Sequence, residues 1–298
     1  MRRSPAAERH DPPARAHRWQ AEAPIAADDV PARVCAEADL SAADWAGVLA
    51  HGGLWIDRKR WTGQPLPAGA LCVVYAFTRP PVEPPLGPDA LLFDAHGLLA
   101  INKPAWWPTQ GTRASAAFSA EARVQALFGD PALRAVHRLD RQTSGVLLFA
   151  REGRLAGRIH DQFRAHAVHK RYLARVAPPP AADRFTVRGP LVRVANEGHS
   201  RFALDEGAAG LDSKTDFAVI ERHADEALIE ARPHTGRTHQ LRVHLAHHGC
   251  PIRGDALYGP EWRPGAPERV LLHALRLRLK VDGRGLDIEA PPPPDLTR

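Results

Sequence analysis

Cysteine is scarce in this chain, and the three cysteines present, Cys35, Cys72 and Cys250, lie far apart in the sequence. Their number is odd, and no Cys-x-x-Cys pair occurs. A disulfide framework needs paired cysteines and a zinc knuckle needs closely spaced ones, so the sequence indicates neither. We expect ordinary thiols.

Long apolar runs are also missing. No run approaches the roughly 18 residues that cross a bilayer, and no apolar segment follows the first five residues as it would in a secretory signal. We therefore expect a cytoplasmic protein with no membrane association.

Acidic residues are the minority among the charged ones. The chain holds 40 Lys and Arg against 34 Asp and Glu, a net charge of +6, and arginine greatly outnumbers lysine. A basic, arginine-rich chain favours a polyanionic partner. Without membrane signals, nucleic acid is the expected partner.

Composition divides the chain into four parts. Residues 1–28 are rich in Ala, Arg, Pro and His without apolar periodicity, which predicts a mobile basic leader. Residues 29–78 predict a small helix-plus-hairpin module. Residues 79–87 contain repeated prolines, which are typical of a stiff linker. Residues 88–298 then form the main domain.

The pattern inside the small module is local. Ser41 is a good helix cap, and the helix that it begins is expected to run through Leu49 and to end at Gly52 and Gly53. Apolar stretches at 54–57 and 71–77 predict two strands.

The main domain predicts strands and helices that do not alternate regularly. This order favours an α+β fold with a mixed, mostly antiparallel central sheet flanked by helices and loops, rather than a βαβ repeat. Strands are expected at 98–101, 171–176, 217–220 and 227–230, and helices at 117–128, 155–165 and 238–248.

Residues 137–145 read His-Arg-Leu-Asp-Arg-Gln-Thr-Ser-Gly and precede an apolar run. Asp140 lies between two arginines, Arg138 and Arg141, which keep a carboxylate ionised, and Thr143 begins a turn-forming stretch. The pattern predicts an active-site loop with Asp140 as nucleophile or base. An ion-paired surface aspartate is the alternative.

Two further segments carry candidate residues. Strand periodicity at 170–176 directs Tyr172 towards a core or a cleft, where it could stack on an extruded base or simply fill the core. In the segment 233–245, Thr238 is a good helix cap, and Arg242 lies one turn inside the helix, where it could reach a buried carboxylate. A solvated basic helix is the alternative, for Arg237 above all.

Histidines near the end of this segment raise the question of a metal. Because no His-Glu-x-x-His pattern or nearby acid accompanies them, no metal site is expected. The residues concerned are His239, His244, His247, His248 and Cys250.

Together the three segments resemble the RluA-type pseudouridine synthase family. The resemblance rests on His-Arg-Leu-Asp-x-x-Thr-Ser-Gly at 137–145, Lys-x-Tyr at 170–172 and Gly-Arg-Thr-His-Gln-Leu-Arg at 236–242. Shorter pieces at 102–104, 254–259 and 272–274 agree, so that the resemblance covers residues 90–295. Residues 30–77 resemble part of the alpha-L RNA-binding module, although its Arg-Leu-Asp opening is missing. Two tryptophans, at 106 and 107, replace small residues expected after Asn-Lys-Pro and are expected to reshape the substrate cleft.

The resemblance implies isomerisation of uridine to pseudouridine in ribosomal or transfer RNA by a monomer that needs no cofactor and no metal. Asp140 would be the essential carboxylate, either trapping the sugar covalently or abstracting a sugar proton to give a glycal. Tyr172 would stack on the uracil and help to remove its carbon-five proton, and Arg242 would pair with Asp140. Arg138 would fill the space of the extruded base. The remaining substrate-binding residues implied are His137, Thr143, Lys170 and Arg237.

Two other functions stay open on the sequence. A catalytically silent RNA-binding or ribosome-assembly protein of the same fold would keep the scaffold without the reaction. A hydrolytic nucleoside or glycoside enzyme would need a second carboxylate as acid partner, which the motifs do not supply.

Overall fold

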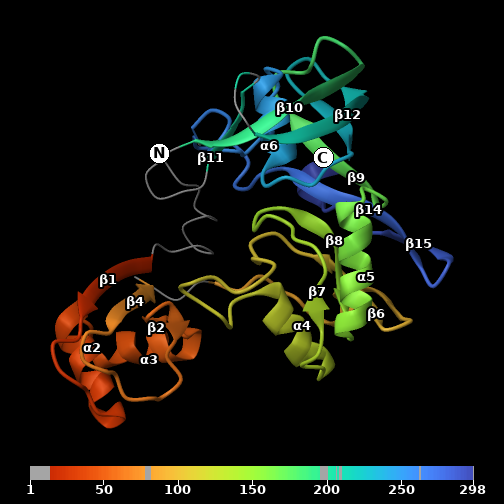
Figure 1. Ribbon diagram of the computed structural model, residues 1–298. Helices are drawn as coiled ribbons and strands as arrows, with labels where there is room; N and C mark the ends of the chain where they lie inside the picture. Colours follow the sequence, from red (N-terminus) through yellow and green to blue (C-terminus); the bar gives the residue numbers. More distant parts are fainter. Residues whose placement is uncertain are drawn as a thin grey trace.

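The computed structural model describes residues 14–77, 82–194, 201–205, 207, 210–261 and 263–297. These residues form two β-sheets with helices packed against them (Figure 1). The strands are β1 (Ala14–Gln20), β2 (Leu54–Ile56), β3 (Lys59–Arg60), β4 (Leu71–Phe77), β5 (Leu91–Ala95), β6 (Leu98–Lys103), β7 (Arg134–Ala135), β8 (Ser144–Ala150), β9 (His169–Val176), β10 (Arg184–Val194), β11 (Arg201–Leu204), β12 (Leu211–Arg222), β13 (Ala227–Pro233), β14 (Leu272–Val281) and β15 (Arg284–Glu289). The helices are η1 (Ala27–Asp29), α2 (Val30–Ala38), α3 (Ala42–His51), η2 (Pro88–Ala90), α4 (Ala120–Phe128), α5 (Gly153–Arg164), α6 (Gln240–His247) and α7 (Pro294–Thr297).

The N-terminal sheet has the strand order β1-β4-β2-β3 and packs against α2 and α3. The cap predicted at Ser41 is confirmed: its side chain accepts the amide of Asp44, and the Asp44 carboxylate accepts the amide of Ser41 in return. Such a reciprocal pair satisfies two of the free amides of the first helical turn. Gly52 ends α3 in the left-handed conformation, with φ 63°.

The expected mobile leader differs from the structure where the two overlap. Residues 14–20 form β1, which pairs with β4 along its whole length, from Ala14 opposite Phe77 to Gln20 opposite Leu71. The prediction missed this strand because its arginines and alanines lack an apolar alternation. Residues 1–13 of the expected leader lie outside the described residues. Residues 78–81, where the expected module passes into the expected linker, also lie outside them.

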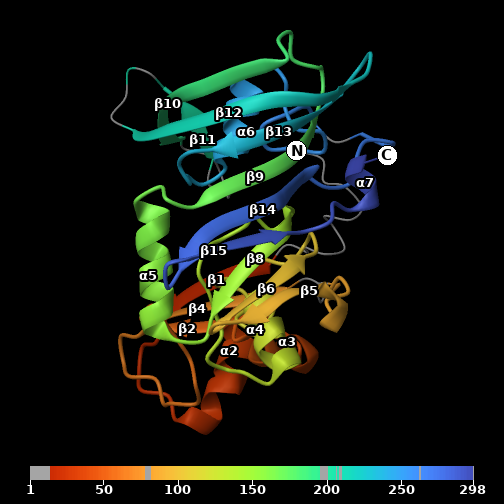
Figure 2. The same ribbon diagram turned by 90° about the vertical axis from the view of Figure 1, so that its right-hand side faces the viewer.

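The large sheet has eleven strands, and its main path runs β11-β10-β12-β13-β9-β14-β8-β6-β5. Figure 2 shows these strands side by side across the sheet, with α5 on one side of it. Neighbouring strands run antiparallel along this path except β8 and β14, which are parallel where His273 and Ala274 meet Ser144 and Gly145. The expected mixed, mostly antiparallel sheet is confirmed.

Strands β6 and β8 are buried on both faces and separate two parts of the core. Leu98 and Leu148 face the side covered by Leu155 and Ile159 of α5. Phe149, next in sequence, faces the opposite side, where α4 and Trp107 pack. Because side chains alternate along each strand, β6 and β8 contribute to the core on both faces of the sheet. The loops that connect these strands are therefore attached to a well-packed core.

The two sheets meet where the end of α3 contacts the loop 112–116. Trp55 Nε1 donates to the Arg113 carbonyl at 2.8 Å, and the Ala116 amide donates to the His51 carbonyl at 2.8 Å. Arg60 lies over the Trp55 ring at 4.5 Å and donates to the Thr112 carbonyl. The N-terminal module is therefore attached to the segment that connects Thr109 to α4.

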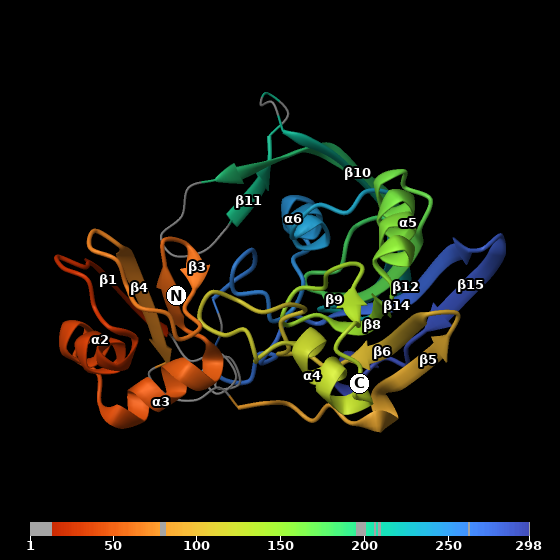
Figure 3. The ribbon, with the colours of Figure 1, turned by 60° about the horizontal axis from the view of Figure 1, so that its bottom comes forward.

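Two helix starts differ from prediction. Helix α4 begins at Ala120, because the Ser119 hydroxyl caps it by accepting the amide of Ala122. Helix α6 begins at Gln240 and not at the expected cap Thr238, because His239 takes the left-handed conformation with φ 57°. In Figure 3 the arm formed by β10 and β11 passes over α6. None of the helices described is long and apolar enough to cross a membrane.

Candidate active site

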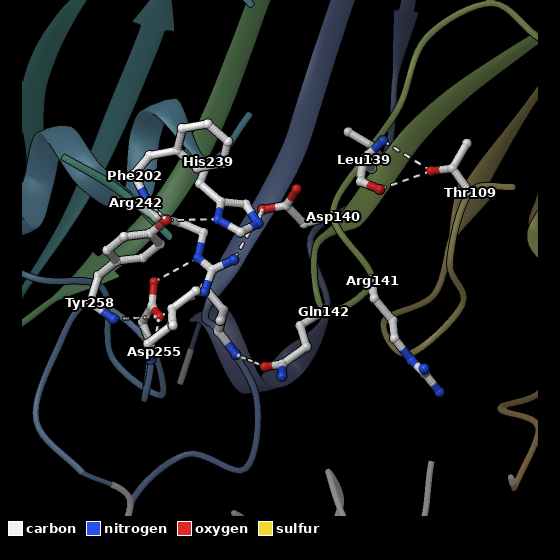
Figure 4. Close-up of polar contacts among 12 residues, drawn as sticks. Thr109, Leu139, Asp140, Arg141, Gln142, Phe202, His239, Arg242, Asp255 and Tyr258 are labelled. Atoms are coloured by element: carbon white, nitrogen blue, oxygen red, sulfur yellow. Dashed lines mark hydrogen bonds and ion pairs between the residues drawn. The ribbon is translucent and has the colours of Figure 1, made fainter. Parts of the chain in front are cut away.

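A pocket of about 550 Å³ opens between the loop before β8 and the start of α6. Its lining includes all of the residues predicted from the motifs: Asp140, Tyr172, Arg242, Arg138, His137, Thr143, Arg237 and Lys170. They come from separate segments of sequence that the large sheet brings together. Figure 4 shows Asp140 facing His239 and Arg242 across this space.

The loop that carries Asp140 is fixed on both sides of the carboxylate. The Thr143 amide donates to the Asp140 carbonyl at 3.0 Å and closes a turn over residues 140–143. The turn-forming stretch was expected to continue through Ser144 and Gly145, but these two residues already belong to β8. Thr109 Oγ1 accepts the Leu139 amide at 3.0 Å and donates to the Leu139 carbonyl at 2.9 Å. The Trp106 amide donates to the Arg141 carbonyl at 2.7 Å. The Asp140 side chain thus projects from a backbone with little freedom to move.

Arg242 is held by a carboxylate that the sequence analysis did not name. Its Nε and Nη2 donate to the two oxygens of Asp255 at 2.7 and 2.8 Å, and its Nη1 donates to Asp140 Oδ2 at 3.3 Å. Two nitrogens of the planar guanidinium fit the Asp255 carboxylate, and the third nitrogen is left to bind Asp140. Arg242 therefore links a structural carboxylate to the candidate reactive one.

The Arg242–Asp255 pair is desolvated. The Asp255 side chain is 1% exposed and the Arg242 side chain 11%, whereas Asp140 is 30% exposed towards the pocket. Burial by itself lowers the pKa of Arg242, but the hydrogen bonds and charge of Asp255 and the charge of Asp140 outweigh it and raise the pKa. The guanidinium therefore stays charged beside Asp140.

Tyr172 lies on β9 and lines the pocket, and it packs against the α4 side of the core and against the core formed by β9, β13 and α6. Burial, followed by the nearby charge of Asp140, raises the pKa of its phenol well above the usual range. The hydroxyl therefore stays protonated at neutral pH. An aromatic ring in this state fits stacking on a base better than it fits removal of a proton as a phenolate.

Two cationic side chains lie on the opposite wall. Lys170 Nζ donates to the Thr235 carbonyl at 2.8 Å, and burial together with Arg237 lowers its pKa to about 8. The Arg237 side chain donates to the Asp212 carbonyl at 3.1 Å. Arg138 is exposed and lines the pocket.

His137 and Thr143 line the pocket but also support the loop. His137 Nε2 accepts the Leu148 amide at 3.1 Å, and burial, with Lys170 and His160 nearby, lowers its pKa to about 3. The imidazole is therefore neutral and anchors the loop to β8. Thr143 is buried, and its amide closes the turn at Asp140.

His239 is a site residue that was considered from the sequence only as a possible metal ligand. Its Nδ1 lies 2.8 Å from the Tyr258 hydroxyl, and its Nε2 lies 3.8 Å from Asp140 Oδ2. The Tyr258 oxygen also accepts the Phe202 amide, so the hydroxyl joins β11 to His239. The short Gly-Asp-Ala-Leu-Tyr-Gly piece at 254–259 was the available signal for Asp255 and Tyr258.

The other histidines of this region contact different partners. His244 Nε2 lies 2.8 Å from the Ser213 hydroxyl, and the His248 ring stacks on Phe185 at 4.0 Å. Across the described part of the chain, no group of three or more His, Cys, Asp or Glu side chains is arranged to hold a metal. Trp107 is buried beside Phe118 in the core and does not line the pocket, while Trp106 lies beneath the Asp140 loop.

Comparison with known proteins places this geometry in a family. Residues 97–247 match the family model described as RNA pseudouridylate synthase. Ribosomal large subunit pseudouridine synthase C of Yersinia pestis is 35% identical over 211 residues, which cover 68% of this chain and 65% of that protein. The protein of the same name from Salmonella typhi is 35% identical over 220 residues, covering 70% and 68%. The chain thus matches about two thirds of the length of these relatives.

Solved structures agree with the sequence comparison. The structure of human RNA pseudouridylate synthase domain containing 1 superposes with a TM-score of 0.59 at 30% identity, covering 72% of this chain and 89% of that chain. Human RNA pseudouridylate synthase domain containing 4 gives a TM-score of 0.58 at 26% identity, covering 70% and 90%. The expected pseudouridine synthase-like α+β architecture is confirmed, and the chain belongs to the RNA pseudouridylate synthase family, of the RluA type that its motifs resemble.

Proposed function

We propose that this protein isomerises uridine to pseudouridine in RNA, with Asp140 as the essential carboxylate. The observation that carries the proposal is the convergence of Asp140, Tyr172 and Arg242 on one pocket, with Arg242 donating to Asp140 at 3.3 Å. The relatives named for the large ribosomal subunit make its RNA the first substrate to test.

The reaction breaks the bond between N1 of uracil and C1′ of ribose and forms a bond from C5 to C1′. Positive character develops on the sugar when the first bond breaks, and the partly exposed Asp140 carboxylate can bond to C1′ or remove the proton from C2′. Arg242, held by Asp255, donates to that carboxylate and orients it. After rotation, C5 bonds to C1′ as the bond from C1′ to Asp140 breaks or, in the glycal route, as Asp140 returns the proton to C2′. The C5 proton then leaves to water, and N1 takes up a proton from water.

The uracil must leave the RNA stack before it reaches Asp140. The Tyr172 ring offers it a stacking surface, an interaction of about 1 to 3 kcal/mol per base. Arg138 at the rim is placed to enter the space that the base vacates, and Arg237 and Lys170 bring positive charge to the flanking phosphates.

The test uses large-subunit ribosomal RNA labelled with tritium at C5 of uridine. We expect the wild-type protein to release tritium to water and to form pseudouridine. Asp140→Asn keeps the size of the side chain but removes its charge, so the single-turnover rate should fall by at least about a thousandfold, while RNA affinity changes less than about threefold. Arg138→Met serves as a binding control, because it should weaken affinity with Asp140 intact.

Each rival function predicts a different product. A silent RNA-binding protein would bind the RNA without releasing tritium from any variant. A hydrolase would release free uracil instead of forming pseudouridine. If Asp140→Asn kept more than about a tenth of the wild-type rate, Asp140 would not be the essential carboxylate.

A further inference from the structure

Arg269 is a buried cation that lies outside the pocket and behind the Asp140 loop. The residue is 6% exposed. Its Nε and Nη2 both donate to the Asp295 carboxylate, each at 2.7 Å. Its Nη1 donates to the carbonyls of Val270 at 2.9 Å and of Gln142 at 3.3 Å. One guanidinium therefore joins the segment before β14, the chain after β15 and the loop of Asp140.

Gln142 receives this contact two residues after Asp140. Its backbone carbonyl accepts from Arg269, and its side-chain Oε1 accepts the Val270 amide at 2.9 Å. The Asp140 loop is thus tied to the segment 269–270 through both the main chain and a side chain of one residue. Thr109 holds the other side of the same loop, at Leu139.

The same segment supports the loop of Asp255. The Leu271 amide donates to the Arg253 carbonyl at 2.9 Å. At Gly254, with φ 77°, an added Cβ would lie 1.8 Å from the Arg269 carbonyl oxygen, so the two backbones are in direct contact. Residues 269–271 therefore contact both loops whose carboxylates share Arg242, and their position sets the distance between those carboxylates.

The Asp295 anchor is itself fixed. Leu296, next in sequence, is fully buried, and its carbonyl accepts from Arg175 Nε at 2.9 Å. The four-residue helix α7 is thereby attached to the core by its neighbours. The Asp295 side chain is 49% exposed, so substituting it disturbs the core little.

From this geometry we propose that Arg269, anchored by Asp295, is a positioning residue that holds the Asp140 loop at the correct distance from the Arg242–Asp255 pair. The proposal rests on the proposed function, because the distance matters only if Asp140 reacts. Arg269 does not line the pocket and does not touch the substrate. Only a planar fork with several donors can bind a carboxylate and two carbonyls together, so lysine can keep the charge but not the bridge.

The test compares Arg269→Lys and Asp295→Asn with Arg276→Lys. Arg276 forms a similar fork with Asp287, at 2.6 Å for both bonds, but on the β14–β15 hairpin away from the pocket. In Arg269→Lys the single-turnover rate should fall at least about tenfold with RNA affinity within about twofold, because a misplaced catalytic group costs rate rather than binding. Asp295→Asn should show a smaller loss of rate, and Arg276→Lys none.

A second readout does not depend on the reaction. The Thr143 amide, which closes the turn at Asp140, should exchange its hydrogen faster in Arg269→Lys than in Arg276→Lys, at equal thermal stability. Should Arg269→Lys fail to fold, Asp295→Asn carries both measurements, since its side chain is half exposed.

The outcomes separate the two proposals. Wild-type rate and unchanged Thr143 exchange in both Arg269→Lys and Asp295→Asn would overturn the positioning role. A wild-type protein that forms no pseudouridine, with faster Thr143 exchange in the variants, would overturn the proposed function and leave the structural role standing.

Discussion

Lys170 is the pocket residue whose charge is expected to change in the alkaline range. Burial, with the neighbouring Arg237, lowers the pKa of its amine to about 8. The ammonium is therefore present below pH 8 and is lost as the pH rises through that value. Because a lost cation weakens contact with phosphate, we expect the KM for RNA to rise about fivefold between pH 7 and 9 in the wild-type protein.

Substitution of the lysine distinguishes this cause from others. Lys170→Met should have the higher KM already at pH 7 and should show no further rise to pH 9. The measurement is a KM series across pH with a single RNA at constant ionic strength. A rise of equal size in Lys170→Met would assign the effect to another group.

The site residues that could be predicted from the sequence are those that belong to recognisable motifs. Asp140, Tyr172 and Arg242 are recognisable because their neighbours form patterns, and all three line one pocket. Asp255 was not assigned a role, because sequence does not say which of the many acids a buried arginine will meet. That choice depends on the turn at Gly254, which directs Asp255 at Arg242.

At the level of elements, Gly145 fixes the parallel contact between β8 and β14. It has φ 112°, and an added Cβ would lie 2.2 Å from the Ala274 carbonyl oxygen. A side chain there would be strained and would push the two central strands apart. We expect Gly145→Ala to lower the free energy of unfolding by at least about 2 kcal/mol and to reduce activity, because Asp140 lies in the loop that leads into this strand.

Gly157 provides the matched control for this change. It lies within α5, where an added Cβ meets nothing within 4 Å. Gly157→Ala should raise the free energy of unfolding by up to about 1 kcal/mol, since alanine favours helix. The free energy of unfolding of both variants is measured by denaturant unfolding. Equal changes in the two variants would show that the β8–β14 contact has room for a side chain at position 145.

Elements were predicted best where a local signal defines them. Ser41 and Gly52 are such signals, and the structure has α3 between them. The strands β1, β10, β14 and β15 and the helix α2 were not expected. Residues 275–281 of β14 do alternate apolar and charged side chains, a signal that the prediction missed. By contrast, β1 and β10 pair with strands far away in the sequence. Strand pairing over such distances cannot be predicted from a single sequence.

For the molecule as a whole, positive charge should govern RNA affinity, and the N-terminal module remains a predicted RNA contact. Affinity should fall at least about tenfold between 50 and 200 mM salt as counterions are released. Arg18, exposed on β1, belongs to the module. Arg18→Met should weaken binding and reduce the slope of log affinity against log salt by about one.

The control for this measurement is an exposed arginine at the other side of the protein. Arg284 begins β15, which Figure 1 shows on the side away from the N-terminal module. Arg284→Met should leave the salt slope unchanged. If Arg18→Met also left it unchanged, β1 would not contact RNA.

The place of β14 in the large sheet has a consequence for how the chain folds. In the order β9-β14-β8, the described strands between residues 91 and 150 share no ladder with those between residues 169 and 233, and among the strands that the structure describes they are joined through β14, which begins at Leu272. During synthesis, Asp140 and Tyr172 therefore leave the ribosome on two half-sheets that must wait for a later segment. Contacts across such sequence separations form slowly. The pocket comes into being late, in the step that inserts β14, and a nascent chain that has not reached this strand carries the reactive residues without an active site.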